Sequence, residues 1–507
     1  MMKPSHFLAL DLGAESGRAI VGTLAGDRLG LEECHRFPNR PLSLPTGLHW
    51  DIPTLWREIQ HGIAAAAHRY PLASLALDGW GVDFALLDEK GALLGPPHTY
   101  RDARTDGMVA EAFRRVPREQ IFAQTGIQFM QINTLYQLLA MAQAGDPQLA
   151  AARTFLTIPD LFNAWLSGSR CCEFTNASTT QCLDPHTRTW ALPLLEALGI
   201  PGAIFPTLCE PGTTLGPLLP AVAREVTAAA AGAADTVVAA GELPVIAPAC
   251  HDTGSAVVAI PAENAGFAWI SSGTWSIMGA ELDQPNLSPQ ALAFNFTNEG
   301  GVCGTWRLSK NVMGLWLVQE CKREWDLSYA ELTRLAAEAR PFLAVIDPDA
   351  PLFLHPGGMP ERIRAFCRAS GQAVPETQGE LVRVVLESLA LKYRLTLAQL
   401  EALTGARLEP VHIIGGGTQN RLLNQLTADC TGRPVVAGPV EATALGNIAV
   451  QAIALGRLES LTQARAVVRR SFEVEVYQPG ARAGWDEGYA MLLSLVDGAT
   501  LEEHYSG

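Results

Sequence analysis

FLALDLGAESGRAIVGTL, residues 7–24, consists of two apolar runs joined by a polar tip that carries Gly13 and Gly17. This pattern predicts a β-hairpin. Glycine permits positive φ angles and lets backbone N–H groups approach an anion closely, while Ser16 and Arg18 add a hydroxyl donor and a fixed cation. The tip is therefore a candidate phosphate-binding loop, with an ordinary turn as the alternative.

A related pattern recurs later in the chain, in residues 267–278. The apolar run Phe267–Ile270 leads into the tip Ser271–Thr274, and Trp275–Met278 continues beyond it. One Gly/Ser tip is typical of a plain turn. Two such hairpins, separated by about half the chain, favour two similar half-molecules that each carry one candidate phosphate loop.

The composition bounds the class of protein. With 507 residues and 48% hydrophobic content, the chain can form two or three domains with substantial cores. It has 37 basic and 52 acidic residues, a net charge of −15. This balance argues against nucleic acid or an anionic membrane as a partner, because both require a basic surface. An anion site must therefore be built locally.

Segments for targeting and for metal or disulfide chemistry are not evident. The apolar run at residues 7–10 is too short for a signal-peptide core, and no apolar span of membrane length follows, so we expect a cytoplasmic protein. Ten cysteines are scattered without a Cys-x-x-Cys motif, and only Cys171 and Cys172 are adjacent. We expect mostly buried, reduced thiols rather than a zinc site or a disulfide framework.

In the first half, polar groups gather after a predicted strand. Asp51-Ile52-Pro53 predicts the start of a helix, and Ser74–Leu77 predicts a buried strand that ends at Asp78. Residues 79–83 then place glycines and carboxylates where open α/β sheets bind ligands. Trp80 in this segment can cover a sugar face or pack in the core. Residues 84–94 predict another hairpin, and Leu156–Asp160 leads into a helix.

In the second half, two turns carry the candidate chemistry. Strand Leu243–Ile246 leads to a turn at 249–255 that exposes His251 beside Asp252, where Asp252 is a catalytic candidate or a helix N-cap. Residues 411–414 predict a buried strand, and the turn Gly415–Asn420 suits a nucleotide lying against backbone, although it is not the dinucleotide fingerprint. We expect helices at 310–319, 380–403 and 441–455.

Taken together, these motifs resemble the FGGY family of sugar kinases over nearly the whole chain. The resemblance implies an α/β fold with two ribonuclease-H-like domains of the actin and hexokinase type, each a mixed five-stranded sheet flanked by helices, with an interdomain cleft. It rests on residues 11–18, 80–83, 100–102, 133–136, 251–253, 272–275, 310–316 and 415–417.

Domain ranges and roles follow from the resemblance. Residues 1–243 are expected to form the N-terminal domain, with the sugar site and first phosphate hairpin; residues 244–507 are expected to supply the base, the second hairpin and the adenosine site. Asp252 is the expected general base. The expected ATP-binding residues are Ala14, Glu15, Ser16, Gly17, Arg18, Thr274, Gln319 and Gly416; the expected sugar-binding residues are Gly81, His251, Asp252, Thr253 and Asn311; and Asp11 is expected to hold Mg²⁺ through water.

The implied reaction is phosphorylation of a ketose by Mg-ATP. L-Rhamnulose is the expected substrate, with L-fuculose and L-xylulose as alternatives, because a few loop side chains decide sugar stereochemistry. A nucleotide-binding regulator of the actin-type superfamily, without a sugar acceptor, is a more distant alternative. We expect a monomer or homodimer, with no nucleic acid or membrane partner.

Overall fold

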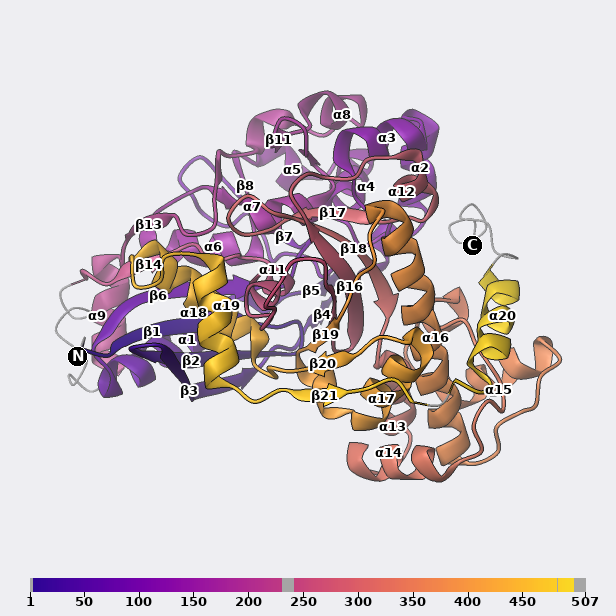
Figure 1. Cartoon of the computed structure of the whole chain (residues 1–507). Coiled ribbons are helices and arrows are strands. Elements are labelled where there is room, and N and C mark those ends of the chain that lie inside the picture. Colours follow the sequence, from indigo (N-terminus) through magenta and orange to yellow (C-terminus); the bar gives the residue numbers. More distant parts are fainter. Residues whose placement is uncertain (1–2, 230–240, 481, 497–507) are drawn as a thin grey trace. The chain divides into compact units, whose positions relative to one another are not determined.

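The computed structural model describes residues 3–229, 241–480 and 482–496 (Figure 1). Contacts divide the chain into two compact units that are discontinuous in sequence. The first contains residues 1–263, 282–307 and 442–472; the second contains residues 264–281, 308–441 and 473–507. Whether 1–243 and 244–507 are separate sequence domains stays a prediction.

The first unit is built on a six-stranded mixed sheet in the order β13-β14-β6-β1-β2-β3. β1 pairs antiparallel with β2 and parallel with β6, and β6 pairs parallel with β14. The strands are β1 Ser5–Leu12, β2 Ser16–Ala25, β3 Arg28–Pro38, β6 Leu72–Gly79, β13 Thr214–Pro217 and β14 Pro244–Ile246.

The second sheet has seven strands in the order β17-β18-β16-β15-β19-β20-β21. β15 pairs antiparallel with β16 and parallel with β19, as β1 does with β2 and β6. The strands are β15 Ala268–Ser272, β16 Trp275–Leu282, β17 Thr297–Gly300, β18 Trp306–Met313, β19 Val411–Ile414, β20 Val435–Ala437 and β21 Glu475–Tyr477.

Both sheets contain the expected five-strand core with strands added at the edges. β3-β2-β1-β6-β14 and β18-β16-β15-β19-β20 have the same order, a meander of three strands followed by two further strands. The expectation of five strands is wrong as a count, because β13 extends the first sheet and β17 and β21 extend the second. Such short edge strands shield the backbone groups of the core strands from further pairing.

Helices pack against the sheets with their apolar faces, and capping residues fix where several of them begin. Asp51 accepts a hydrogen bond from the Thr54 N–H at 3.1 Å and begins α1, as predicted. Helices of the first unit are α1 Ile52–Arg69, α2 Met108–Arg115, α3 Arg118–Thr125, α4 Thr134–Ala144, α5 Pro147–Ala151, α6 Ile158–Ser167, α7 Phe174–Ala177, α8 Leu192–Ala197, α9 Pro220–Ala229, α11 Asp252–Val258, α12 Pro289–Ala293, α18 Ala442–Ala454 and α19 Leu461–Ser471.

The second unit is organised around one long buried helix, α16. The Thr377 hydroxyl and the Glu380 carboxylate form a capping box at its start. Helices of this unit are α13 Trp316–Arg323, α14 Tyr329–Glu338, α15 Met359–Ala369, α16 Gln378–Thr404, α17 Arg421–Thr431 and α20 Trp485–Val496.

Most element predictions are confirmed, and two are corrected. Residues 310–313 belong to strand β18, and the helix begins only at Trp316, so the predicted 310–319 helix is wrong in its first half. A Cβ at Gly314 would lie 2.6 Å from the Trp275 carbonyl carbon; this close backbone approach separates strand from helix. The 84–94 segment does turn back, but β7 Phe84–Leu87 has β8 Thr154–Thr157 as its regular partner.

The burial of the cysteines and the lengths of the helices can be compared with what the composition predicts. Six of the ten cysteines are buried, and Cys303 is exposed. Within residues 3–229, 241–480 and 482–496, no helix is both long and apolar enough to cross a membrane.

Candidate active site

Three carboxylates lie where neighbouring strands of the first sheet end. Asp11 on β1 pairs in register with Asp78 on β6, and Gly79 forms a parallel bridge with His251, the residue before Asp252. The Gly79 N–H also donates to the Cys250 carbonyl at 2.9 Å. The carboxyl ends of adjacent parallel strands are where open α/β sheets bind ligands, and here they assemble Asp11, Asp78 and Asp252.

These carboxylates perturb one another. Burial raises the pKa of Asp78 well above its ordinary value, and the charges of Asp11 and Asp252 raise it further. Burial also raises the pKa of Asp252, against an opposing effect of His251. The Arg18 guanidinium pairs with Asp11. Clustered carboxylates with raised pKa values are typical of a functional site.

The donor set fits a hard divalent cation. The Asn447 amide donates to Asp78 Oδ2 at 2.6 Å, whereas Asp78 Oδ1 is buried without a hydrogen-bond partner among the described residues. Mg²⁺ prefers carboxylate oxygens and water as ligands. Asp11 and Asp78 together therefore suit Mg²⁺, held directly or through water; the sequence had suggested only Asp11.

The backbone that carries Asp252 is fixed by a buried glutamate. Glu173 Oε2 accepts hydrogen bonds from the Cys250 N–H at 2.9 Å and from the Thr175 hydroxyl at 2.6 Å, and Thr175 Oγ1 accepts from the His251 N–H at 3.2 Å. Burial raises the pKa of Glu173 to about 7. Asp252 is the first residue of α11, and His251 occupies the N-cap position, so the N-cap alternative for Asp252 is wrong.

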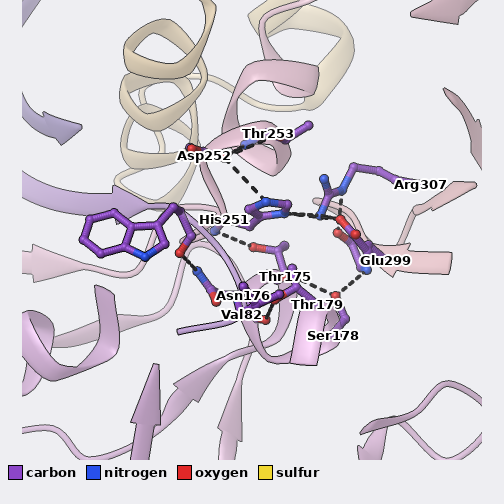
Figure 2. A network of polar contacts seen from close by, with 12 residues as sticks. Val82, Thr175, Asn176, Ser178, Thr179, His251, Asp252, Thr253, Glu299 and Arg307 are labelled. Carbon is purple, nitrogen blue, oxygen red and sulfur yellow. Dashed lines mark hydrogen bonds and ion pairs between the residues drawn. The ribbon is translucent and has the colours of Figure 1, made fainter. Parts of the chain in front are cut away.

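The His251 side chain is held from the far side by Glu299 and Arg307 (Figure 2). Arg307 Nη2 lies 3.1 Å from His251 Nδ1 and 3.1 Å from Glu299 Oε2, and His251 Nε2 lies 3.5 Å from Asp252 Oδ1. Arg307 is fully buried, while the Asp252 side chain remains 30% exposed. The Asp252 carboxylate is thus partly exposed, whereas the residues behind it are buried.

Gly81 lies in a tight turn after β6. A Cβ at Gly81 would lie 3.0 Å from Thr179 Oγ1, and this hydroxyl accepts from the Val82 N–H at 3.1 Å. Val82 has φ of 65°, which is unusual for a β-branched residue and marks a strained turn. Strain of this kind often accompanies a ligand site.

Trp80 and Asp83 are structural rather than exposed. Asp83 Oδ2 accepts from the Trp50 indole at 2.6 Å and from the Trp80 indole at 3.0 Å, and the two indoles lie 4.4 Å apart. Trp80 is 5% exposed, which favours the core-packing alternative over a sugar platform. Burial raises the pKa of Asp83 to about 6.

The first hairpin tip has the predicted turn. The Gly13 N–H donates to the Ser16 carbonyl at 2.9 Å, and the Asn39 amide donates to the Gly13 carbonyl at 3.0 Å. A Cβ at Gly17 would lie 2.3 Å from the Phe37 ring, so this glycine permits packing beneath the tip. Glu15 is exposed, and Ala14 and Ser16 are half-buried.

In the second unit, the expected nucleotide residues surround the second hairpin. The Leu315 and Trp316 N–H groups donate to the Gly273 and Thr274 carbonyls, both at 3.0 Å, so the hairpin tip meets the start of α13, which carries Gln319. A Cβ at Gly417 would lie 2.0 Å from Ser272 Oγ, which places the glycine turn against the same hairpin. The segments that carry Thr274, Gln319 and Gly416 therefore all adjoin the second hairpin.

Asn311 lies on β18 rather than on a helix. Two residues further along, the Met313 N–H donates to Asp349 Oδ1 at 2.6 Å. Lys392 Nζ lies 2.8 Å from Asp347 and 2.9 Å from Asp349, forming a buried ion cluster beneath the strand end. This cluster supports the end of β18 that carries Asn311.

Comparison with known proteins identifies the family. Residues 6–241 match the N-terminal domain, and residues 268–455 the C-terminal domain, of the FGGY family of carbohydrate kinases. The chain belongs to this FGGY family. The chain is 43% identical over 493 residues to a protein named rhamnulokinase from Bacteroides thetaiotaomicron, covering 97% of this chain and 99% of that protein.

Other FGGY relatives agree. A rhamnulokinase from Oceanobacillus iheyensis is 40% identical and covers 93% of this chain and 97% of its own. Among solved structures, a xylulose kinase from Lactobacillus acidophilus has a TM-score of 0.81 at 16% identity, covering 97% of this chain and 98% of its own. A Plasmodium falciparum glycerol kinase with ADP has a TM-score of 0.76 at 15% identity, covering 98% and 99%. These two show a shared fold.

Sequence reasoning missed the role of five supporting residues of the FGGY site. Asp78 was noted only as a strand end, and Glu173, Thr175, Glu299 and Arg307 were not singled out. Pairing of strand ends could have indicated Asp78, since it ends a buried strand beside the one that ends in Asp11. The contacts of Glu299 and Arg307 with His251 depend on folding between distant segments, and nothing local signals them.

Proposed function

We propose that this FGGY kinase transfers the γ-phosphoryl group of Mg-ATP to the 1-hydroxyl of L-rhamnulose, forming L-rhamnulose 1-phosphate and ADP in L-rhamnose breakdown in the cytoplasm. The identity of 40–43% to proteins named rhamnulokinase over more than nine-tenths of the chain supports this substrate. The observation that carries the chemistry is Asp252, a partly exposed carboxylate held by buried neighbours at the strand ends.

Asp252 acts as the general base. A sugar hydroxyl is a weak nucleophile, so a positioned carboxylate must accept its proton during attack. As the hydroxyl oxygen bonds to the γ-phosphorus, its proton passes to Asp252, and the bond from phosphorus to the bridging oxygen of ADP breaks. The raised pKa of Asp252 makes it a better proton acceptor than an ordinary aspartate.

The remaining residues bind and orient the reactants. Hairpin residues 14–18, Thr274, Gln319 and Gly416 contact ATP, and Gly81, His251, Thr253 and Asn311 join Asp252 around the sugar. Asp11 and Asp78 would hold Mg²⁺, directly or through water, and the bound ion would neutralise phosphate charge. Exclusion of water from the site prevents it from competing with the sugar as acceptor.

The first test measures ADP release from Mg-ATP with L-rhamnulose, L-fuculose, L-xylulose, L-ribulose and glycerol. We expect the highest kcat/KM with L-rhamnulose. If L-fuculose or L-xylulose gives the highest value, the substrate assignment is wrong while the kinase chemistry stands. If no sugar stimulates ADP release, the proposed activity fails.

The base is tested with Asp252→Asn, which keeps the side-chain volume. We expect kcat to fall by at least about 100-fold, the lower end of the contribution of a general base. Asp27→Asn, at an aspartate that is 67% exposed on the same unit, is the matched control and should keep wild-type kcat. An Asp252→Asn enzyme as active as the wild type would overturn the base assignment.

A further inference from the structure

Two cysteines from distant parts of the first unit lie side by side. Cys171 immediately precedes strand β9 Cys172–Glu173, and Cys209 ends strand β12 Leu208–Cys209. The two short strands pair in parallel, with Cys209 opposite Glu173. This pairing brings together two thiols that are 38 positions apart in the sequence.

The two sulfur atoms are in direct contact. Cys171 Sγ lies 2.9 Å from Cys209 Sγ, whereas the sulfurs of a disulfide are separated by about 2.05 Å. The sulfurs must therefore approach each other by about 0.9 Å, a movement that rotation of the side chains can supply. The strands behind them are held in register, because the Cys172 N–H donates to the Thr207 carbonyl at 3.0 Å.

Both thiols are accessible to small reagents. Cys171 and Cys209 are half-buried, whereas the nearby Cys172 and Cys182 are fully buried. A thiolate on either accessible cysteine can accept a hydrogen bond from the S–H of the other, and Ser169 Oγ lies 3.4 Å from Cys171 Sγ. Thiol–disulfide exchange requires an accessible thiolate with a second thiol beside it, and this pair supplies both.

We propose that Cys171 and Cys209 form a reversible disulfide by exchange with a low-molecular-weight disulfide, and that the new bond cross-links β9 to β12. One cysteine thiolate attacks the small disulfide, which gives a mixed disulfide and releases one small thiol. The other cysteine thiolate then attacks the protein sulfur of the mixed disulfide and releases the second small thiol. In total, the two cysteines lose two protons and two electrons, and these reduce the small disulfide to two thiols.

The cross-link should stabilise the first unit without changing its fold. It closes a loop between residues 171 and 209 and so restricts the unfolded chain. Cys209 lies opposite Glu173, whose carboxylate accepts from the Cys250 N–H at 2.9 Å behind Asp252. Because the disulfide keeps this register, oxidation should raise the unfolding temperature by a few degrees and leave kcat for the proposed reaction within about twofold of its value in the reduced protein.

The experiment maps the cross-link in the intact folded protein. The protein is treated with oxidised glutathione, its remaining thiols are blocked with iodoacetamide under denaturing conditions, and its tryptic peptides are analysed by mass spectrometry. Peptide 171–188 should be joined to peptide 189–224, and dithiothreitol should separate them. Fragmentation should place the link at Cys171, because the first peptide also carries Cys172 and Cys182.

Variants test whether the stabilisation comes from this pair. Cys171→Ser and Cys209→Ser should each abolish both the cross-link and the rise in unfolding temperature on oxidation. Cys303→Ser, at an exposed cysteine of the same unit, is the matched control and should retain both. Each variant is compared with its own reduced form, so a general loss of stability does not affect the comparison.

The outcomes separate this inference from the proposed function. A wild-type protein that forms no cross-link, or forms it at Cys172 or Cys182, overturns the inference, even if a variant fails to fold. A cross-linked protein whose unfolding temperature does not rise, or whose kcat falls beyond the stated limit, overturns the stabilising role. The cross-link and the unfolding temperature are measured without a sugar, so both stand even if L-rhamnulose proves not to be a substrate.

Discussion

At the scale of residues, the buried carboxylates of the first unit differ in what satisfies their oxygens. Asp83 accepts from Gln137 on Oδ1 at 3.0 Å, and from two indoles and the Tyr100 N–H on Oδ2. Asp78 has one amide partner on Oδ2 and, among described residues, none on Oδ1. The first pattern is typical of a structural carboxylate, whereas the second leaves an oxygen of Asp78 that can serve as a ligand.

Substitution of Asp78 should therefore separate stability from cation binding. The pKa of Asp78 is raised in the folded state, so ionisation of this carboxyl destabilises the folded protein. The wild type should therefore lose stability relative to Asp78→Asn as the pH rises through that raised pKa. We expect Asp78→Asn to unfold, without Mg²⁺, at a temperature no lower than wild type, and to gain less from Mg²⁺ with ADP. Thermal unfolding with and without these ligands measures both.

Asp83→Asn is the matched comparison. The asparagine N–H₂ group would face groups that donate hydrogen bonds to Asp83 in the wild type. The free energy of unfolding should therefore fall by roughly 1–3 kcal/mol, while the increase in unfolding temperature on addition of Mg²⁺ and ADP should be unchanged. The assignment of Asp78 to the cation would be wrong if its variant gained as much from Mg²⁺-ADP as the wild type does.

At the scale of elements, the second hairpin organises the expected nucleotide site. Its strand β15 pairs parallel with β19, with Ser271 opposite Ile414, so the hairpin tip and the glycine turn that follows β19 leave the same edge of the sheet. Gly415 has φ of 84°, which starts the turn in a conformation that favours glycine. The turn and the hairpin therefore pack directly against each other, with a Cβ at Gly417 only 2.0 Å from Ser272 Oγ.

Neighbouring glycines in this turn should respond differently to alanine. A Cβ at Gly417 would lie 2.5 Å from Ser272 Cβ and 2.9 Å from its carbonyl oxygen, whereas a Cβ at Gly416 meets nothing within 4 Å in the described part of the chain. We expect Gly417→Ala to lower both the unfolding temperature and the affinity for ATP. Gly416→Ala should keep the unfolding temperature and raise KM for ATP, because its methyl group enters space proposed for the nucleotide.

Steady-state kinetics and thermal unfolding of the two variants test this directly. KM for L-rhamnulose should change little in Gly416→Ala. An unchanged KM for ATP in that variant would remove Gly416 from the nucleotide site.

At the scale of the whole molecule, each compact unit is completed by distant segments of sequence. Helices α18 and α19, from residues 442–471, lie beside the first sheet (Figure 1). Gln451 donates to the Leu8 carbonyl at 3.0 Å and accepts from the Ser74 hydroxyl at 2.7 Å, while Asn447 reaches Asp78. Helix α18 also packs closely on α11, because Gly446 has no side chain: a Cβ at this position would lie 1.7 Å from the Ser255 carbonyl oxygen.

In a chain that ends at residue 441, the first unit should not fold stably. Without α18 and α19, the apolar face of its sheet and the carboxylate of Asp78 would be exposed to solvent. Limited proteolysis should digest residues 3–263 rapidly in this truncation. A chain that ends at residue 480 retains α18 and α19 and should keep the same region resistant. A stable, cooperatively unfolding fragment 1–243 would contradict this expectation and would favour the contiguous domains predicted from the sequence.

The sequence by itself determined the local features of this FGGY kinase: both hairpins, the capped start of α1, the buried strands predicted at residues 74–77 and 411–414, and His251 beside Asp252 at a strand-to-helix turn. Apolar periodicity, caps and glycine turns act within a few residues, so their effects can be read locally. Tertiary structure alone decided that residues 310–313 form a strand, that α18 covers the first sheet, and that Glu299 and Arg307 hold His251. Those outcomes depend on which surfaces meet after the chain folds, because burial and pairing between distant segments override local preference.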